Sequence, residues 1–249
     1  MASMANLILF LASLWAGAQN ALAGGGSFIT LPSLMLTGMD ARAANITSTV
    51  ALFPAQIATG WTGRAHVAGA AGLRFRTLVI LSFIGGALGA ILLLVTPAQF
   101  FAHLVPYLVL FATAVFTWGS FRPRPTEGGH LSRTGAAVVQ MLISIYGGYF
   151  GGGIGFLMLA ALTAAGMLIR NAGATKNVLA AVMNASAVLI FVFSPEVHWM
   201  AAGITAGGAI IGGVVGGLMM NRINERALRL LIVLIGVALT VGLLLKSPG

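Results

Sequence analysis

The sequence predicts an all-α integral membrane protein with two inverted-topology repeats of about five membrane segments each. Hydrophobic residues make up 59% and charged residues 7% of the 249 residues, whereas soluble domains carry about 25% charged residues. Apolar runs long enough to cross a bilayer, about 20 residues, recur along the whole chain. Two glycine triplets, at 24–26 and 151–153, stand at matching places in the two halves. We therefore expect one membrane-embedded bundle with no sizeable soluble domain.

The number and location of the basic residues are typical of a membrane protein. Thirteen lysine and arginine residues against four acidic residues give a net charge of +9. Most of the basic residues fall in short loops between apolar runs, where they orient a chain in the bilayer. We therefore expect membrane lipid as a partner and no nucleic acid. The chain has no cysteine, which excludes disulfides and thiol chemistry.

Each half contains five apolar segments, and the second of each five is short. The segments cover residues 5–23, 26–38, 43–63, 77–96 and 101–121, then 134–151, 153–169, 172–193, 199–220 and 227–245. The two short segments would reach about 20 and 26 Å as helices, less than or close to the hydrocarbon thickness. They either cross part of the membrane or fold back along the preceding segment as a re-entrant hairpin.

The first 23 residues resemble a signal peptide, because an apolar run precedes Ala21-Leu22-Ala23. No lysine or arginine precedes this run, and the segment has a counterpart in the second half. We expect it to be retained as a helix.

The two halves match residue by residue after the triplets. Arg42, Thr47 and Gln56 stand opposite Arg170, Thr175 and Asn184. The stretch between the halves, RPRPTEGGHLSR, is rich in proline, glycine and charge, which is typical of an exposed linker. We predict a first membrane repeat over 1–121, a cytoplasmic linker over 122–133 and a second membrane repeat over 134–249.

The basic loops predict the orientation of these repeats. Counting every segment places the loops at 64–76, 122–133 and 222–229, together with Arg170, on one side of the membrane. The positive-inside rule makes that side cytoplasmic and puts both termini on the outer face. Five segments per half invert the second half relative to the first, which is typical of secondary transporters.

The glycine triplets predict an anion site. A break in a helix at membrane depth persists only where protein or water covers its peptide groups. The next helix points free N–H groups and the positive end of its dipole at the gap, which favours an anion. The predicted binding residues at the breaks are Gly24, Gly25, Gly26, Ser27, Gly151, Gly152 and Gly153. The alternative is that the glycines only permit close helix packing.

Polar residues near the breaks complete the predicted binding set. They are Thr47, Ser48 and Gln56 in the first half and Thr175, Lys176, Asn177 and Asn184 in the second. Lys176 lies a few residues inside a span, where an ammonium group costs several kcal/mol unless it snorkels, pairs or faces water. Gln56 and Asn184 lie deeper and either join helix to helix or contact the substrate.

Several chemistries are excluded by residue type. The four acidic residues, Asp40, Glu127, Glu196 and Glu225, lie at segment ends or in loops, so no buried proton relay is expected. The four histidines lie far apart in the sequence, and no cysteine or acidic residue accompanies them in ligand spacing, which predicts neither a metal nor a cofactor. Ser27 has no histidine in an apolar segment to act as its base, so we expect no enzyme activity.

The stretches GGGSFITLPSLMLTGMDARAANITSTVA and GGYFGGGIGFLMLAALTAAGMLIRNAGATKNVLAAVMNA resemble the paired signatures of the TauE/SafE family of sulfite and organosulfur anion exporters. The resemblance spans essentially the whole chain. It implies a bacterial or archaeal inner-membrane carrier for small sulfur-containing anions such as sulfite, sulfoacetate or thiosulfate. The second half departs from the pattern, because Leu159 stands opposite Pro32.

We therefore predict a secondary transporter that exports a small oxyanion by rocking one half against the other. With the cytoplasm negative, an outgoing anion gains about 2.3 kcal/mol per charge per 100 mV, so export needs no coupled ion. The alternatives are an anion channel with the same helix ends along a pore, and a non-transporting membrane scaffold subunit. The sequence leaves the oligomeric state open, a homo-oligomer included.

Overall fold

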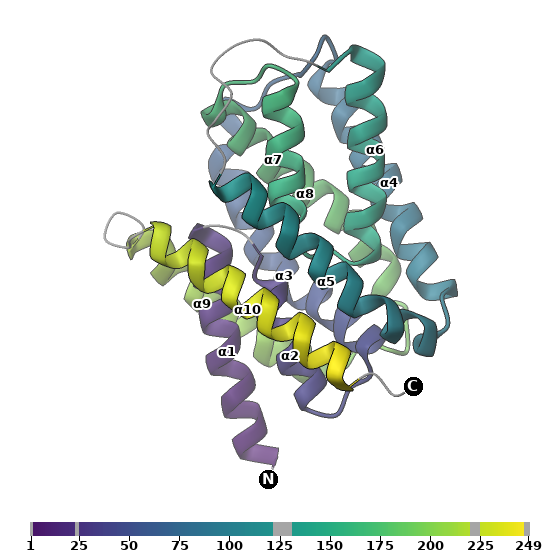
Figure 1. Cartoon of the computed structure of the whole chain (residues 1–249), viewed down its shortest axis with the longest axis vertical. Coiled ribbons are helices and arrows are strands. Elements are labelled where there is room, and N and C mark those ends of the chain that lie inside the picture. The colour runs from purple at the N-terminus through teal and green to yellow at the C-terminus, as the bar shows by residue number, and fades with distance from the viewer. Residues whose placement is uncertain (1, 23–24, 122–130, 220–224, 247–249) are drawn as a thin grey trace.

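The computed structural model describes residues 2–22, 25–121, 131–219 and 225–246, and in these ranges the chain folds into ten α-helices and one short 3₁₀ helix (Figure 1). The helices are α1 (Ala2–Leu22), α2 (Ser27–Leu36), α3 (Ala41–Gly63), η1 (Arg64–His66), α4 (Phe75–Val95), α5 (Ala98–Phe121), α6 (Arg133–Tyr149), α7 (Ile154–Ala164), α8 (Ile169–Phe191), α9 (Trp199–Met219) and α10 (Glu225–Lys246). They confirm the ten predicted segments. Most of the predicted linker, residues 122–130, lies outside the described residues, as does Gly24.

The two short helices end at glycines that adopt positive φ. Gly166 has φ 88°, its N–H donates to the Thr163 carbonyl, and the next N–H, of Met167, donates to the Leu162 carbonyl. This Schellman arrangement ends α7 five residues before the end of the predicted segment. Gly38 ends α2 with φ 96° and donates to the Met35 carbonyl. Glycine tolerates this conformation at little cost, so each short helix has a defined end.

Both short helices fold back along the helix before them. The start of α2 lies against the last turns of α1, because a Cβ on Gly26 would stand 2.8 Å from the Ala16 carbonyl oxygen. The end of α2 lies near the start of α1, since Thr37 and Asn6 line the same cavity. In the second half, the Leu131 N–H just before α6 donates to the carbonyl of Ala164 at the end of α7. Each short helix therefore forms an antiparallel pair with the helix before it.

Glycine faces let the long helices approach closely. A Cβ on Gly148 of α6 would stand 2.1 Å from the Gly86 carbonyl oxygen of α4. A Cβ on Gly212 of α9 would stand 1.8 Å from the Leu14 carbonyl oxygen of α1. Small residues serve this purpose in membranes, where association depends on van der Waals packing and hydrogen bonds. The pairs α1–α9 and α4–α6 flank the central pair α3–α8, and α5 and α10 cross one face of the bundle (Figure 1).

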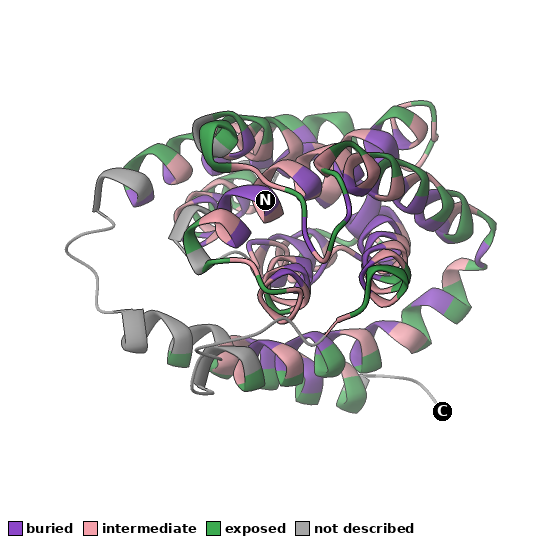
Figure 2. Ribbon diagram, turned by 90° about the horizontal axis from the view of Figure 1, so that it is seen from above, coloured by how far each residue is buried: buried purple, intermediate pink, exposed green. Residues whose placement is uncertain are grey.

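The outer surface is apolar. Exposed residues lie on the outward faces of the helices (Figure 2). Large hydrophobic side chains among them include Ile80, Phe83, Leu88, Leu92 and Val95 of α4 and Ile210, Ile211, Val214 and Val215 of α9. Within the described ranges, four helical stretches are long and apolar enough to cross a bilayer: Phe75–Val95, Ala98–Trp118, Arg170–Phe191 and Trp199–Gly216. A large exposed apolar surface of this kind indicates a multi-pass membrane protein.

The two ends of the bundle differ in charge. The starts of α4, α6 and α8 meet the end of α7 in one hydrophobic cluster, which includes Leu78, Ala136, Met158 and Leu179. Exposed basic residues lie at this end: Arg64, Arg74, Arg76, Arg133 and Arg170. At the opposite end the described side chains include Asp40, Arg42, His103, Glu196 and His198. Among the described side chains, the positive charge is therefore concentrated at one end of the bundle.

We expect the substitution Gly148→Val to destabilise the protein. The added side chain would collide with the backbone of Gly86, so α4 and α6 would have to separate at a cost of about 3 kcal/mol or more. Thermal unfolding of the purified protein in detergent measures this loss. The matched control is Gly203→Val, because a Cβ on Gly203 of α9 meets nothing within 4 Å. Equal unfolding temperatures for the two variants would contradict the packing described.

Candidate functional site

The first glycine break is largely closed by its own helix. Gly25 has φ 80°, and its carbonyl oxygen accepts a hydrogen bond of 3.2 Å from Nε2 of Gln19. The N–H of Gly26 donates to Oδ1 of Asn20 at 3.4 Å. At the start of α2, the Phe28 N–H donates to the Gly25 carbonyl. The Gly25 carbonyl and the Gly26 N–H are therefore both bonded, whereas Oε1 of Gln19 is buried without a partner among the described residues.

The second break leaves more N–H groups free. The Tyr146 hydroxyl donates to the Gly152 carbonyl oxygen at 2.8 Å, and Gly151 and Gly153 have φ 80° and 73°. Within the described part of the chain, four consecutive residues at the start of α7 have N–H groups without an acceptor: Gly152, Gly153, Ile154 and Gly155. Unpaired N–H groups at a helix start carry partial positive charge and bind anions.

Lys176 places a positive charge beside these N–H groups. Its Nζ lies 3.6 Å from where a Cβ on Gly155 would stand, in the first turn of α7. No hydrogen bond or ion pair joins Lys176 to another described residue. An ammonium group next to the positive end of a helix is unfavourable unless an anion lies nearby. The second break therefore combines free N–H groups with a lysine amine that has no acidic partner among the described side chains.

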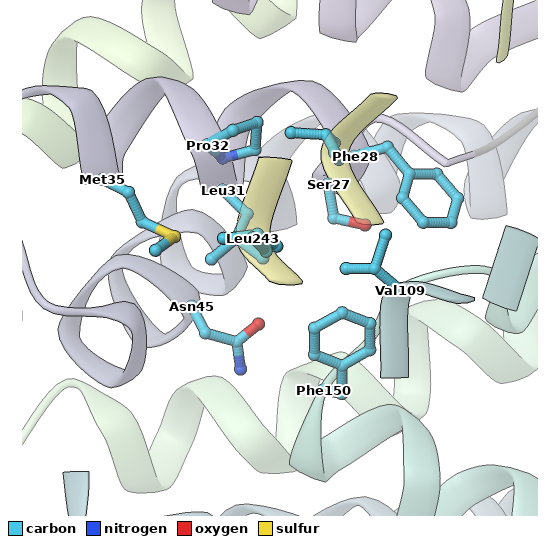
Figure 3. Close-up of a pocket in the computed structure, with 10 residues that line it drawn as sticks. Ser27, Phe28, Leu31, Pro32, Met35, Asn45, Val109, Phe150 and Leu243 are labelled. Atoms are coloured by element: carbon cyan, nitrogen blue, oxygen red, sulfur yellow. The ribbon is translucent and has the colours of Figure 1, made fainter. Parts of the chain in front are cut away.

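A small pocket lies between the flanks of the two breaks. Ser27, which follows the first triplet, and Phe150, which precedes the second, both line it (Figure 3). Asn45 of α3 also lines the pocket and donates from Nδ2 to the Tyr149 carbonyl oxygen at 3.1 Å. The remaining lining is mostly apolar and leaves about 10 Å³ for the centre of a water-sized sphere, room for about one water. In this conformation the pocket is too small for an oxyanion such as sulfite.

Thr47 and Thr175, both predicted to bind the anion, instead accept hydrogen bonds from the connections between helices. The buried Thr47 accepts a hydrogen bond of 3.2 Å from the His198 N–H, in the connection between α8 and α9. The buried Thr175 accepts one of 3.1 Å from the Ala68 N–H, in the connection between α3 and α4. Thr47 and Thr175 thus make equivalent contacts in the two halves.

The other predicted polar residues lie along α3 and α8. Ser48 pairs with the Thr30 hydroxyl of α2 at 2.6 Å. Nδ2 of Asn184 donates to Oε1 of Gln56 at 2.6 Å, which joins α8 to α3. Asn177 is half-buried, and its carbonyl oxygen would lie 3.5 Å from a Cβ on Gly60. The structure therefore joins Gln56 to Asn184 directly and leaves Lys176 alone beside α7.

Three features of this region were not predicted from the sequence. They are Tyr146, Asn45 and the ion pair of Arg42 with Glu196, which joins α3 to the connection before α9. Arg42 also donates to the Thr96 carbonyl oxygen at 2.5 Å. The repeat offset provides one signal for Tyr146, because it stands opposite Gln19. The partners of Arg42 are distant in sequence and follow no local pattern.

The helical bundle, its apolar surface and its two internal helix starts define a multi-pass membrane protein with a candidate anion site. The family model described as sulfite exporter TauE/SafE matches residues 9–243, and the chain belongs to this family. Curated relatives are similar over nearly their whole length. A probable membrane transporter protein of Haemophilus influenzae is 27% identical over 94% of this chain and 92% of its own length. The probable membrane transporter protein YfcA of Escherichia coli K12 is 26% identical over 97% and 90%.

A third relative, the probable membrane transporter protein ORF9 of a Sinorhizobium species, is 28% identical over 95% of this chain and 91% of its own length. No solved structure matches the chain. The family and these relatives indicate that the protein is a membrane transporter.

We expect Gln56→Leu and Asn184→Leu to be destabilising singly and less than additive together. Either single substitution leaves one buried amide without its partner, which costs about 1–3 kcal/mol. The double variant replaces both polar groups with apolar groups of similar size, so part of this cost is recovered. Thermal unfolding of the four proteins in a double-mutant cycle measures the coupling. Strictly additive losses would show that the amides do not bond to each other.

Proposed function

We propose that the protein is a secondary transporter that exports a small sulfur-containing oxyanion, such as sulfite, sulfoacetate or thiosulfate, across a bacterial or archaeal inner membrane. The observation that carries the proposal is the unpaired Lys176 beside four free N–H groups of α7. An oxyanion supplies both the acceptors and the negative charge that this arrangement lacks. The description of the family, which names sulfite export, supports the chemical class.

The proposed binding residues are those that the sequence predicted. They are Gly24, Gly25, Gly26, Ser27, Thr47, Ser48, Gln56, Gly151, Gly152, Gly153, Thr175, Lys176, Asn177 and Asn184. Their contributions would differ with conformation. Thr47 and Thr175 would turn to the anion only when the loops that they now hold move away. Gln56 and Asn184 would become available only when their mutual hydrogen bond opens.

Two inverted repeats, residues 1–121 and 134–249 with a linker over 122–133, would provide the required movement. Matched contacts support this division. α1 of the first repeat packs on α9 of the second, and this pair corresponds to α6 of the second repeat, which packs on α4 of the first. The loop contacts of Thr47 and Thr175 correspond in the same way. Gln56 and Asn184 stand at equivalent positions and bond to each other, as residues on a pseudo-two-fold axis do.

We assign the basic end of the bundle to the cytoplasm. Five exposed arginines lie there, whereas Arg42 at the opposite end is paired with Glu196. By the positive-inside rule, α1 would then start and α10 would end on the outer face. In this orientation α6 and α7 form a hairpin from the cytoplasmic side, and α1 and α2 form one from the outside.

We expect Lys176→Gln to reduce sulfite flux in proteoliposomes at least tenfold. The substitution removes a charged contact to the anion, and such contacts contribute about 1.5–3 kcal/mol. Thermal stability should be retained or raised, because an uncompensated charge is removed. The matched control is Arg76→Gln, which removes an exposed charge from the same end and should leave flux unchanged. Full flux through the Lys176 variant would exclude the proposed site.

We expect sulfite export to follow the membrane potential. An outgoing monovalent anion gains about 2.3 kcal/mol per 100 mV, so an inside-negative potential should accelerate efflux without any cation gradient. Efflux from proteoliposomes under a potassium diffusion potential measures this. Efflux that ignores the potential would exclude the uniport mechanism. Saturating flux without unitary currents distinguishes a carrier from a channel, and absent flux of every anion tested favours a scaffold.

A further inference from the structure

Gln19 and Tyr146 each donate a hydrogen bond to the carbonyl of the middle glycine of a triplet, Gln19 from an amide and Tyr146 from a hydroxyl. Gln19 donates from its amide nitrogen to the Gly25 carbonyl oxygen at 3.2 Å. Tyr146 donates from its hydroxyl to the Gly152 carbonyl oxygen at 2.8 Å. Each donor lies six residues before the middle glycine of its triplet. The two side chains therefore hold equivalent peptide groups in the two breaks.

Holding a carbonyl also aims the next N–H group. In a trans peptide the C=O and N–H bonds lie in one plane and point in opposite directions. The bond from Gln19 therefore fixes the direction of the Gly26 N–H, and the bond from Tyr146 fixes that of the Gly153 N–H. Glycine accesses both signs of φ readily, so without such a bond these peptides are free to rotate.

The Gly26 and Gly153 N–H groups differ in their hydrogen-bond acceptors. The Gly26 N–H donates to Oδ1 of Asn20. The residue at the equivalent place in the second half is Gly147, which has no side chain. The Gly153 N–H consequently has no acceptor in the ranges that the structure describes. The Gly26 N–H is therefore satisfied by a side chain of α1, whereas the Gly153 N–H, two residues before the Gly155 that lies near Lys176, is free within the described part of the chain.

The Tyr146 ring is itself held in place. It makes edge-to-face contacts with Phe111 of α5, at 5.6 Å between ring centres, and with Phe150, at 6.1 Å. These contacts do not involve the hydroxyl group. Removing the hydroxyl alone therefore releases the Gly152 carbonyl while the aromatic packing stays.

We propose that Tyr146 is a positioning residue for the anion, which binds at the second break, and that Gln19 and Asn20 make the first break structural. The proposal rests on the proposed function and refines it. Tyr146 keeps the Gly153 N–H directed at an oxyanion that also meets the neighbouring N–H groups of α7 and the Lys176 ammonium. The ligand class is a small oxyanion with at least three acceptor oxygens, such as sulfite or a sulfonate.

The test compares Tyr146→Phe with Tyr149→Phe in the purified full-length protein. Both substitutions remove one phenolic hydroxyl near the end of α6, and no described residue bonds to the Tyr149 hydroxyl. We expect Tyr146→Phe to weaken sulfite binding at least fivefold by calorimetry, and Tyr149→Phe to change it less than twofold. Hydrogen exchange without sulfite should accelerate over residues 150–156 only in the Tyr146 variant.

A third variant, Gln19→Met, tests which of the two breaks binds the anion. It removes the donor to Gly25 with little change in volume, so we expect a lower unfolding temperature and a sulfite dissociation constant within twofold of the original. If Gln19→Met weakens sulfite binding as much as Tyr146→Phe does, the assignment of the anion to the second break is overturned.

The outcomes also separate this proposal from the proposed function. If the unsubstituted protein binds sulfite and Tyr146→Phe binds it as tightly as Tyr149→Phe does, only the role of Tyr146 is overturned. If the unsubstituted protein binds none of sulfite, thiosulfate and sulfoacetate, the proposed function is overturned and the role of Tyr146 with it. Weaker sulfite binding in the Tyr146 variant, with faster exchange over 150–156, supports both.

Discussion

The need of every peptide group for a hydrogen-bond partner in an apolar environment governs this structure. A helix satisfies its own backbone, so ten helices with glycine-lined contacts raise no difficulty. The helical hydrogen bonding is interrupted at the two glycine breaks, between α1 and α2 and between α6 and α7. At each, a side chain from the preceding helix bonds to the middle glycine. The backbone N–H groups that remain unpaired at these breaks are the groups that can donate hydrogen bonds to a ligand.

The rest of the bundle holds these two turns in position. The α1–α9 and α4–α6 pairs form flanking walls, and their glycines let the backbones nearly touch. Between the walls, α3 and α8 carry the polar residues that reach across the molecule. Three such contacts, from Thr47, Thr175 and Asn184, connect elements more than 100 residues apart. Polar bonds of this kind set the register of helices whose apolar surfaces would pack in several ways.

The apolar pattern located the ten α-helices of the described residues, because a chain that crosses a bilayer needs long apolar runs, but it did not predict η1. The early end of α7 was missed, although Gly166 is a usual signal for it. The sequence also left open whether Gln56 and Asn184 bind each other, since a partner 128 residues away cannot be inferred from local chemistry. Lys176 was singled out by its cost in an apolar segment, but the free N–H groups beside it required coordinates.

The ion pair between Arg42 and Glu196 joins the two halves of the chain at one end of the bundle. Arg170 stands at the place equivalent to Arg42, and Ala68 stands at the place equivalent to Glu196, so the opposite end has no matching carboxylate. On the proposed rocking mechanism, separating the halves at the Arg42 end would break a two-point ionic contact, whereas separating them at the other end would break no ion pair between described residues. On the proposed mechanism, the carrier would open more readily toward the end that carries Arg64, Arg74 and Arg76 than toward the end that carries Arg42.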